Sequence, residues 1–268
     1  MTITTKKLLN TATITLSLGM LTLGSNMAQA QTIAPEMATD STDKLGVQLG
    51  VNVRINNTAY DIDDGDVSVL PSLFFDNGKY YARGSQIGTY LVDDGSNEVL
   101  AFVQPGGSSF DPDDAKGDLA NLDERKWSGL VGASYMRTTP IGGFRAQVST
   151  DVLGRSDGTI ARLTYLGKLT PGKWTIYPSA GLEWVNSNYN EYYYGISQKE
   201  ADKTNLEVYK PDSSISPYIS VNATYNINKD WDLFLGQSVN FLADEQRDSP
   251  MVKDRVDYTT TVGLLYEF

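Results

Sequence analysis

The chain has 268 residues and a net charge of −11, and it contains neither cysteine nor histidine. An acidic balance of this size disfavours nucleic acid as a partner. The absence of cysteine excludes disulfides and thiol chemistry, and the absence of histidine removes the commonest general base and transition-metal ligand. A Ser-His-Asp hydrolase cannot be built from this sequence, and we expect no catalytic, metal-binding or cofactor-binding residues.

The first thirty residues have the organisation of a secretory signal peptide. Lys6 and Lys7 precede an apolar stretch at 8–23, and Ala28-Gln29-Ala30 supplies the small residues of a cleavage site. We therefore expect residues 1–30 to be removed on export and residues 31–43 to form a polar, flexible leader. No cysteine follows the site, which excludes a lipid-anchored lipoprotein.

From residue 44 to the carboxyl end, apolar and polar residues alternate in short segments. The last segment, 258–268, places Val262, Leu264, Tyr266 and Phe268 on one face. Because successive side chains of a strand point to opposite faces, such a segment has one apolar and one polar face. Its length suits a tilted transmembrane β-strand of about 10 residues. Taken alone, it would also suit the edge strand of a soluble sandwich.

Aromatic residues at the ends of the segments favour transmembrane strands over the strands of a soluble sandwich. Trp174 and Trp184 lie at the two ends of one apolar face. In a strand they are about 33 Å apart, or about 25 Å vertically once the strand tilts, which matches the spacing of aromatic girdles at two membrane interfaces. We assign Trp174, Trp184 and Trp231 to these girdles. The terminal Tyr266 and Phe268 are assigned to the signal that the barrel-assembly machinery reads.

Regularly spaced charges on the second face need water or partners, which a wet lumen supplies and a sandwich core does not. Bacterial outer-membrane barrels have an even number of strands, so we expect about 12, with one hidden in the weakly patterned region 56–125; ten is the alternative. The prediction is an all-β fold, a transmembrane antiparallel up-and-down β-barrel over residues 44–268, in the outer membrane of a Gram-negative bacterium. Eleven segments of strand length are visible, at 44–56, 67–75, 80–91, 98–104, 127–138, 144–152, 159–169, 174–184, 215–227, 231–241 and 258–268.

Two connections have a composition of their own. The acidic loop 61–66 resembles a calcium loop, but Asp66 and Ser72 stand where glycine and glutamate are required, so a solvated loop tip is the default. Residues 105–125 are rich in proline, glycine and aspartate and are expected to form a long connection, with a helical turn near 118–125.

Several ordered stretches together resemble the MipA/OmpV family of outer-membrane proteins, the MltA-interacting proteins. The likeness spans nearly the whole mature chain; the one departure is Ile196, where the family often has valine. The stretches are Tyr189–Ser197 with Glu200, Ala201 and Tyr209, then Leu242–Glu245 with Asp248–Val252, the terminal Gly263–Phe268, and Phe110–Asp114 with Leu122–Lys126.

The resemblance implies a small outer-membrane barrel without catalytic residues. The best-described member of the family is a scaffold that holds a lytic murein transglycosylase together with a bifunctional murein synthase, and other members are linked to envelope stress and antibiotic response. The partners expected from it are outer-membrane lipid, the barrel-assembly machinery and these two murein enzymes.

Two late connections are candidates for docking or gating, since loops on a rigid scaffold commonly carry binding. The alternative is that their tyrosines pack against the barrel mouth and that Ser249-Pro250 fixes a turn. The side of the membrane on which these connections lie depends on the strand count. The candidate residues are Tyr192, Tyr193, Tyr194, Gly195, Asp248, Ser249 and Pro250.

Three functions compete. A scaffold for murein enzymes is favoured by the resemblance, and a narrow passive channel for small solutes, antibiotics included, is the alternative. An enzyme would have to work with carboxylates alone and is disfavoured. In a barrel of about 8–12 strands, inward charges either line a polar lumen or fill it by pairing. The expected inward charges are Lys44, Arg54, Arg145, Asp151, Arg162, Lys168, Glu183, Asp257 and Glu267.

Overall fold

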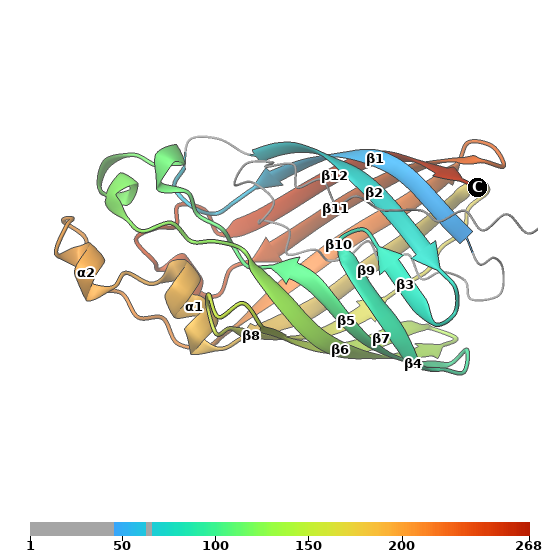
Figure 1. Cartoon of the computed structure of the whole chain (residues 1–268), viewed down its shortest axis with the longest axis horizontal. Coiled ribbons are helices and arrows are strands. Elements are labelled where there is room, and N and C mark those ends of the chain that lie inside the picture. The colour runs from blue at the N-terminus through green and yellow to red at the C-terminus, as the bar shows by residue number, and fades with distance from the viewer. Residues whose placement is uncertain (1–45, 63–65) are drawn as a thin grey trace, which may run out of the picture.

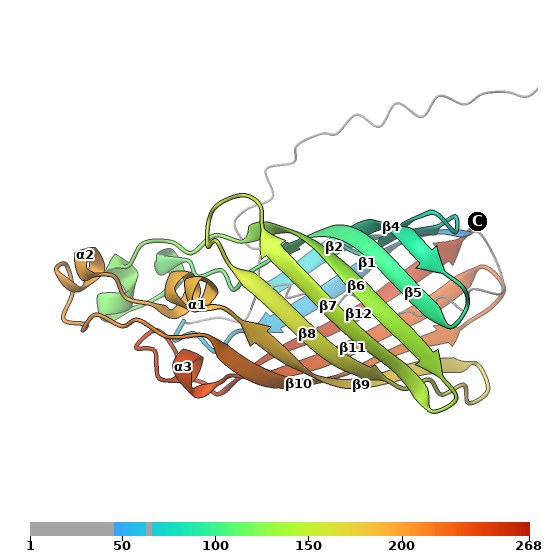
Figure 2. The same cartoon turned by 90° about the horizontal axis from the view of Figure 1, so that it is seen from below.

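The computed structural model describes residues 46–62 and 66–268, and they form a closed antiparallel barrel of twelve strands (Figures 1 and 2). Consecutive strands pair throughout, and β12 pairs with β1 to close the barrel. The signal peptide and the leader expected at 1–43 lie outside the described residues. The strands are β1 (Gly46–Asn57), β2 (Asp66–Asp76), β3 (Tyr80–Arg83), β4 (Gln86–Asp93), β5 (Asn97–Gly106), β6 (Ser128–Thr139), β7 (Gly142–Asp151), β8 (Thr159–Leu166), β9 (Trp174–Val185), β10 (Ser214–Asn226), β11 (Trp231–Phe241) and β12 (Val256–Glu267).

The strand count of 12 is confirmed over the alternative of ten, and the hidden strand does lie in the region 56–125. The single strand expected at 80–91 is wrong in detail, because a turn at Gly84–Ser85 divides it into β3 and β4. Gly84 has a φ of 60°, in the left-handed region that glycine enters without a steric penalty. The Gly84 N–H donates to the carbonyl of Leu73, which fixes the short hairpin against β2.

The two faces of the wall are those that the alternation predicts. Val51 and Leu264 are opposite partners in β1 and β12 and are 50% and 41% exposed, whereas the neighbouring Leu265 is 2% exposed and points inward. On β10, the outward Ile219 is 50% exposed and the inward Ser220 is buried. An apolar outer wall around a polar lumen is the arrangement of a transmembrane barrel.

The connections differ in length at the two ends of the barrel (Figure 1). One end, here called the turn end, carries the first residue of β1, the carboxyl terminus and the short turns 77–79, 94–96, 140–141, 167–173 and 227–230. The other end, the loop end, carries the long connections 107–127, 186–213 and 242–255, and also 152–158. Outer-membrane barrels place short turns in the periplasm and long loops outside, so the loop end is the outer one.

Aromatic side chains gather near the turn end. The ring of Trp174 lies 4.9 Å from that of Tyr225, and the ring of Trp231 lies 5.2 Å from that of Tyr266. Trp184 lies on β9 near the loop end, at the far end of the outward face that begins with Trp174. The assignment of these tryptophans to two girdles and the role of Tyr266 and Phe268 in assembly stay predictions.

The helices of the described residues all lie in the long connections. They are α1 (Ser187–Tyr194), α2 (Gln198–Ala201) and α3 (Asp244–Arg247), with the short 3₁₀ helices η1 (Pro112–Asp114) and η2 (Gly117–Asn121). The helical turn expected near 118–125 is η2, which ends four residues earlier. Within the described residues, no helix has the length and apolar character needed to cross a membrane.

The acidic loop 61–66 is only partly within the described chain, because residues 63–65 lie outside it. Among the residues that the structure describes, no three carboxylates come together as a metal site would require.

Candidate functional site: the capped lumen

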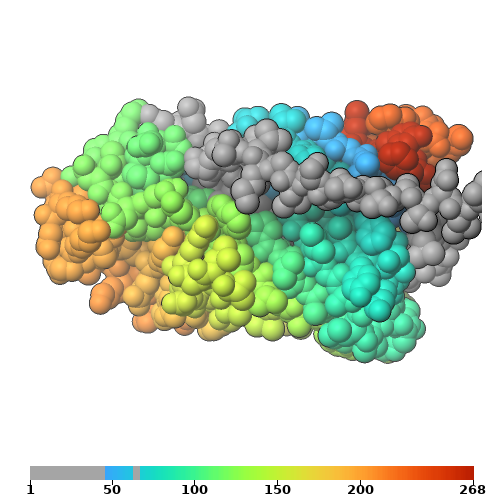
Figure 3. Space-filling model, in the orientation of Figure 1, coloured from blue at the N-terminus to red at the C-terminus, as the bar shows by residue number. Residues whose placement is uncertain are grey.

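The long connections pack together into a cap over the loop end of the barrel (Figures 1 and 3). We define the cap as residues 58–62, 107–127, 186–213 and 242–255. A cluster of buried apolar side chains holds these segments together, although they lie far apart in the sequence. The cluster includes Ala59, Tyr60, Phe110, Leu119, Leu122, Tyr189, Tyr193, Tyr194, Ile196, Leu242 and Met251.

The tyrosine-rich stretch forms α1 rather than an irregular loop. Asn186 caps the helix by accepting from the N–H of Tyr189. One face of the helix buries Tyr193 and Tyr194, while Tyr192 is half-buried and its hydroxyl accepts from the N–H of Lys126. Burying tyrosine rings stabilises a contact best when each hydroxyl finds a partner. Two of the predicted docking residues therefore lie inside the cap.

The hydroxyls of the cap are tied to backbone groups of other segments. Tyr60 donates to the carbonyl of Tyr193 at 2.8 Å, and Ser249 donates to the carbonyl of Tyr194 at 2.6 Å. Burial raises the pKa of Tyr60 and of Tyr194 well above the ordinary tyrosine value, so both hydroxyls stay neutral. Ser249 is buried, whereas its neighbours Asp248 and Pro250 are exposed. The packing interpretation therefore accounts for Tyr193, Tyr194 and Ser249.

A buried ion pair between Arg125 and Glu200, here called the clasp, joins two segments of the cap. Arg125 and Glu200 are 6% and 2% exposed, and their side chains meet at 2.7 Å. Arg125 also donates to the carbonyl of Gly195 at 3.1 Å. The second carboxylate oxygen of Glu200 accepts from the Ser197 N–H and hydroxyl, in a capping box at the start of α2. These hydrogen bonds offset part of the cost of burying the two charges, although Nε of Arg125 is buried without a partner.

We expect the clasp to weaken in acid. Burial raises the pKa of Glu200, but the hydrogen bonds from Ser197 and the charge of Arg125 outweigh it, so this pKa lies below the ordinary glutamate value. Because the folded-state pKa is depressed, the stabilisation is present above the unfolded pKa of about 4.3 and is lost as the pH falls through the folded one. Hydrogen exchange of residues 195–200 measures this loss, with Glu200→Gln as the variant that does not titrate. Protection that stays constant down to pH ~3 would contradict it.

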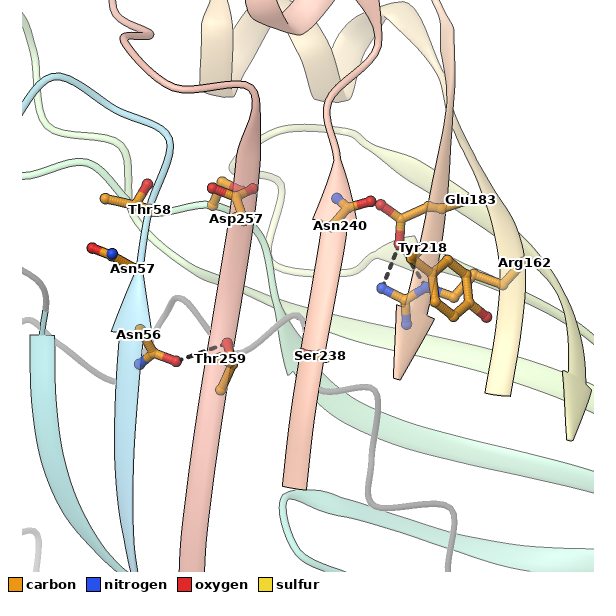
Figure 4. A pocket seen from close by; sticks show the side chains of 11 residues that line it. Asn56, Asn57, Thr58, Arg162, Glu183, Tyr218, Ser238, Asn240, Asp257 and Thr259 are labelled. Carbon is orange, nitrogen blue, oxygen red and sulfur yellow. Dashed lines mark hydrogen bonds and ion pairs between the residues drawn. The ribbon is translucent and has the colours of Figure 1, made fainter. Parts of the chain in front are cut away.

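Below the cap, the lumen contains a small polar cavity of about 50 Å³ (Figure 4). Arg162 on β8 and Glu183 on β9 pair across its wall at 2.5 Å. Asp257 at the start of β12 accepts from the Ala59 N–H at 2.6 Å, which joins the cavity to the cap. A polar cavity of this size accommodates a few water molecules. Asn56, Asn240 and Thr259 are among the other residues of the lining.

Further toward the turn end, side chains fill the lumen. Arg83 lies 3.4 Å from the carboxylate of Asp76 and 3.9 Å from that of Glu98. Its guanidinium carbon lies 4.5 Å from the centre of the Tyr81 ring, and Tyr90 hydrogen-bonds to both Arg83 and Asp76. Paired charges and aromatic rings thus occupy this part of the lumen.

Of the predicted inward charges, the structure brings Arg162 and Glu183 together and places Asp257 on the same cavity. Asp151 lies at the loop end, where its carboxylate accepts from the N–H groups of the connection 152–158. Lys44 lies outside the described residues. The ion pairs Arg83–Asp76 and Arg125–Glu200 were not predicted from the sequence. Arg125 and Glu200 are 75 residues apart, and no local pattern marks them as partners.

Comparison with known proteins identifies the family. The family model described as MltA-interacting protein MipA matches residues 49–268. The chain belongs to the MipA family. It is 33% identical to the MltA-interacting protein of Escherichia coli K12 over 224 residues, which cover 82% of this chain and 89% of that protein. MipA-family proteins are not known as enzymes.

Other MipA-type relatives carry outer-membrane names. The putative outer membrane protein YiaT of E. coli K12 is 26% identical, and the match covers 87% of this chain and 95% of YiaT. OmpV of Vibrio cholerae is 24% identical, and the match covers 90% of this chain and 88% of OmpV. Among solved structures, the translocator domain of the autotransporter NalP from Neisseria meningitidis aligns with a TM-score of 0.45 at 11% identity, over 85% of this chain and 91% of that one. This protein is a β-barrel of the outer membrane of Gram-negative bacteria.

Proposed function

We propose that this protein is an outer-membrane scaffold that holds a lytic murein transglycosylase, together with a bifunctional murein synthase, at the periplasmic face of the membrane. The observation that carries the proposal is the 33% identity to a protein named for its interaction with MltA, over 89% of that protein. A lumen filled by Arg83 and its partners and a packed cap are consistent with a protein that binds rather than conducts. We expect no catalytic activity of its own.

In this proposal the contact surface is the turn end. A periplasmic enzyme meets the short turns, whereas the cap lies on the opposite side of the membrane. The residues at 192–195 and 248–250 then serve the cap and not the murein enzymes. The turn tips offer exposed apolar side chains for such a contact, among them Ile141, which is 72% exposed.

Insertion of a small folded tag tests both the function and the side. We expect a purified lytic murein transglycosylase to be captured by the parent barrel and by a barrel with the tag in the connection 152–158. Capture is expected to be lost when the tag occupies one of the turns 140–141 or 227–230, because exposed tips tolerate insertion while the tag blocks the partner. Capture that fails for the parent, or that only the loop-end tag abolishes, would refute the proposal.

The polar cavity below the cap favours a second candidate, a narrow passive channel for small solutes. Conductance of the purified barrel in planar bilayers separates the two. Steady unitary currents through the parent chain would support the channel, and a silent bilayer with intact enzyme capture would support the scaffold.

A further inference from the structure

The outer wall of the barrel carries an apolar groove of about 520 Å³. It lies mainly across the neighbouring strands β6 to β9 and reaches Val99 of β5 and Ile215 of β10. Most of its side chains belong to the outward set of their strands, with the inward Ser134, Gln147 and Arg162 between them, so the groove opens toward the hydrocarbon layer. Its main lining residues are Ala133, Ala146, Ala161, Leu163, Leu182 and Trp184.

The groove follows from the strand register. Ala146 of β7 faces Tyr135 of β6 on one side and Leu163 of β8 on the other. One row nearer the loop end, Ala161 of β8 faces Trp184 of β9. Small side chains thus form the floor, and an indole, a phenol ring and leucines form the walls. These lining side chains offer an occupant apolar surface, which suits a hydrocarbon chain.

The loop-end margin of the groove is polar and basic. Thr150 lies four residues beyond Ala146 on β7 and Thr159 lies two residues beyond Ala161 on β8, and their hydroxyls are 3.2 Å apart. The connection 152–158 joins these two strands and carries Arg155, whose guanidinium lies 4.9 Å from the centre of the Trp127 ring and donates to the Trp127 carbonyl. Within the described chain, Arg155 has no ion-pair partner.

The carboxylates of the same connection do not neutralise Arg155. Asp151 accepts from the Ser128 hydroxyl and from the N–H groups of residues 153–156, so its oxygens are already occupied. Asp157 is exposed and forms no ion pair in the part of the chain that the structure describes. A guanidinium at the membrane surface attracts an anionic lipid headgroup, and its planar donors suit a phosphate.

We infer that the groove with Arg155 is a binding site for one lipid of the outer leaflet, lipid A, with an acyl chain in the groove and a phosphate at Arg155. The site is apolar near the midplane of the membrane and basic at its outer surface. A lipid has the same arrangement, with acyl chains near the midplane and a phosphate at the surface. The charged residue of its lining, Arg162, is buried and paired with Glu183, so the groove offers no free charge to a polar peptide. A second barrel would leave Arg155 facing apolar surface. The inference is independent of the proposed scaffold role.

Filling the groove tests its apolar part. Ala161→Phe places a ring on the floor, and Ala223→Phe puts the same ring on an outward alanine of β10 that does not line the groove. In mass spectra of intact barrels reloaded with lipid A, we expect Ala161→Phe to retain about tenfold less lipid than the parent, equivalent to about 1.4 kcal/mol. Ala223→Phe should match the parent. The smaller change Ala146→Leu repeats the test if the ring impairs folding.

The headgroup is tested by Arg155→Gln and by lipid choice. We expect this variant to retain about fivefold less lipid A, and the parent to retain lipid A in preference to diacylglycerol, which carries no phosphate. Lys210→Gln, at an exposed lysine elsewhere in the cap, is the matched charge control. Equal retention by Ala161→Phe and the parent, or equal retention of lipid A and diacylglycerol, would overturn the inference.

Discussion

Replacing Arg125 by alanine is expected to release the cap from the barrel mouth. The substitution leaves the carboxylate of Glu200 buried without its partner, at a cost of about 3–5 kcal/mol, and it removes the donor to the Gly195 carbonyl. The wall strands do not use this pair, so the barrel itself should still fold. Limited trypsin digestion measures the release, because Lys199 and Lys203 lie beside the clasp.

Two further variants make this result specific. Asp123→Asn removes the exposed ion pairs with Lys199 and Lys203 but keeps both cleavage sites, and it should cost no more than about 1 kcal/mol, with digestion like that of the parent. Arg125→Met combined with Glu200→Leu replaces both charges by apolar groups and should recover most of the protection. If Arg125→Ala is cleaved at the parental rate, the clasp does not hold the cap.

A charge placed on the outer wall should lower the free energy of unfolding by an amount that depends on its depth in the membrane. Val262 points outward near the middle of β12, and Val262→Arg is expected to destabilise the folded barrel by about 2–4 kcal/mol. Tyr258 points outward at the start of the same strand, and Tyr258→Arg should cost only about 0–1 kcal/mol because the side chain reaches the interface. Urea unfolding in lipid vesicles gives both values. Equal costs at the two positions would contradict the assigned depth.

The barrel wall could be predicted from the sequence because its signal is local. Alternation repeats every two residues, so Val51, Leu264 and the inward Leu265 could be placed on the correct faces without knowledge of their partners. The division at Gly84 was missed because the flanking residues continue a β-rich run on both sides of a two-residue turn. Such a turn changes the strand count without changing the composition.

The cap could not be predicted because its contacts join distant segments. Tyr60 meets Tyr193 across 133 residues, and Arg125 meets Glu200 across 75. The cluster of tyrosines at 192–194 marked the right stretch, but a tyrosine pattern does not tell a docking surface from a packed interior. The even strand count then placed this stretch at the loop end, away from the periplasmic enzymes of the proposed function.

The pairing of β12 with β1 has a consequence for biogenesis. The strand that closes the sheet, β12, is synthesised after the other eleven, so the chain has two unpaired hydrogen-bonding edges until β12 has been made. Closure of the barrel must then follow the synthesis of β12, and a chain truncated by a premature stop codon before residue 256 would present those edges to other chains in the periplasm and become a substrate for proteases.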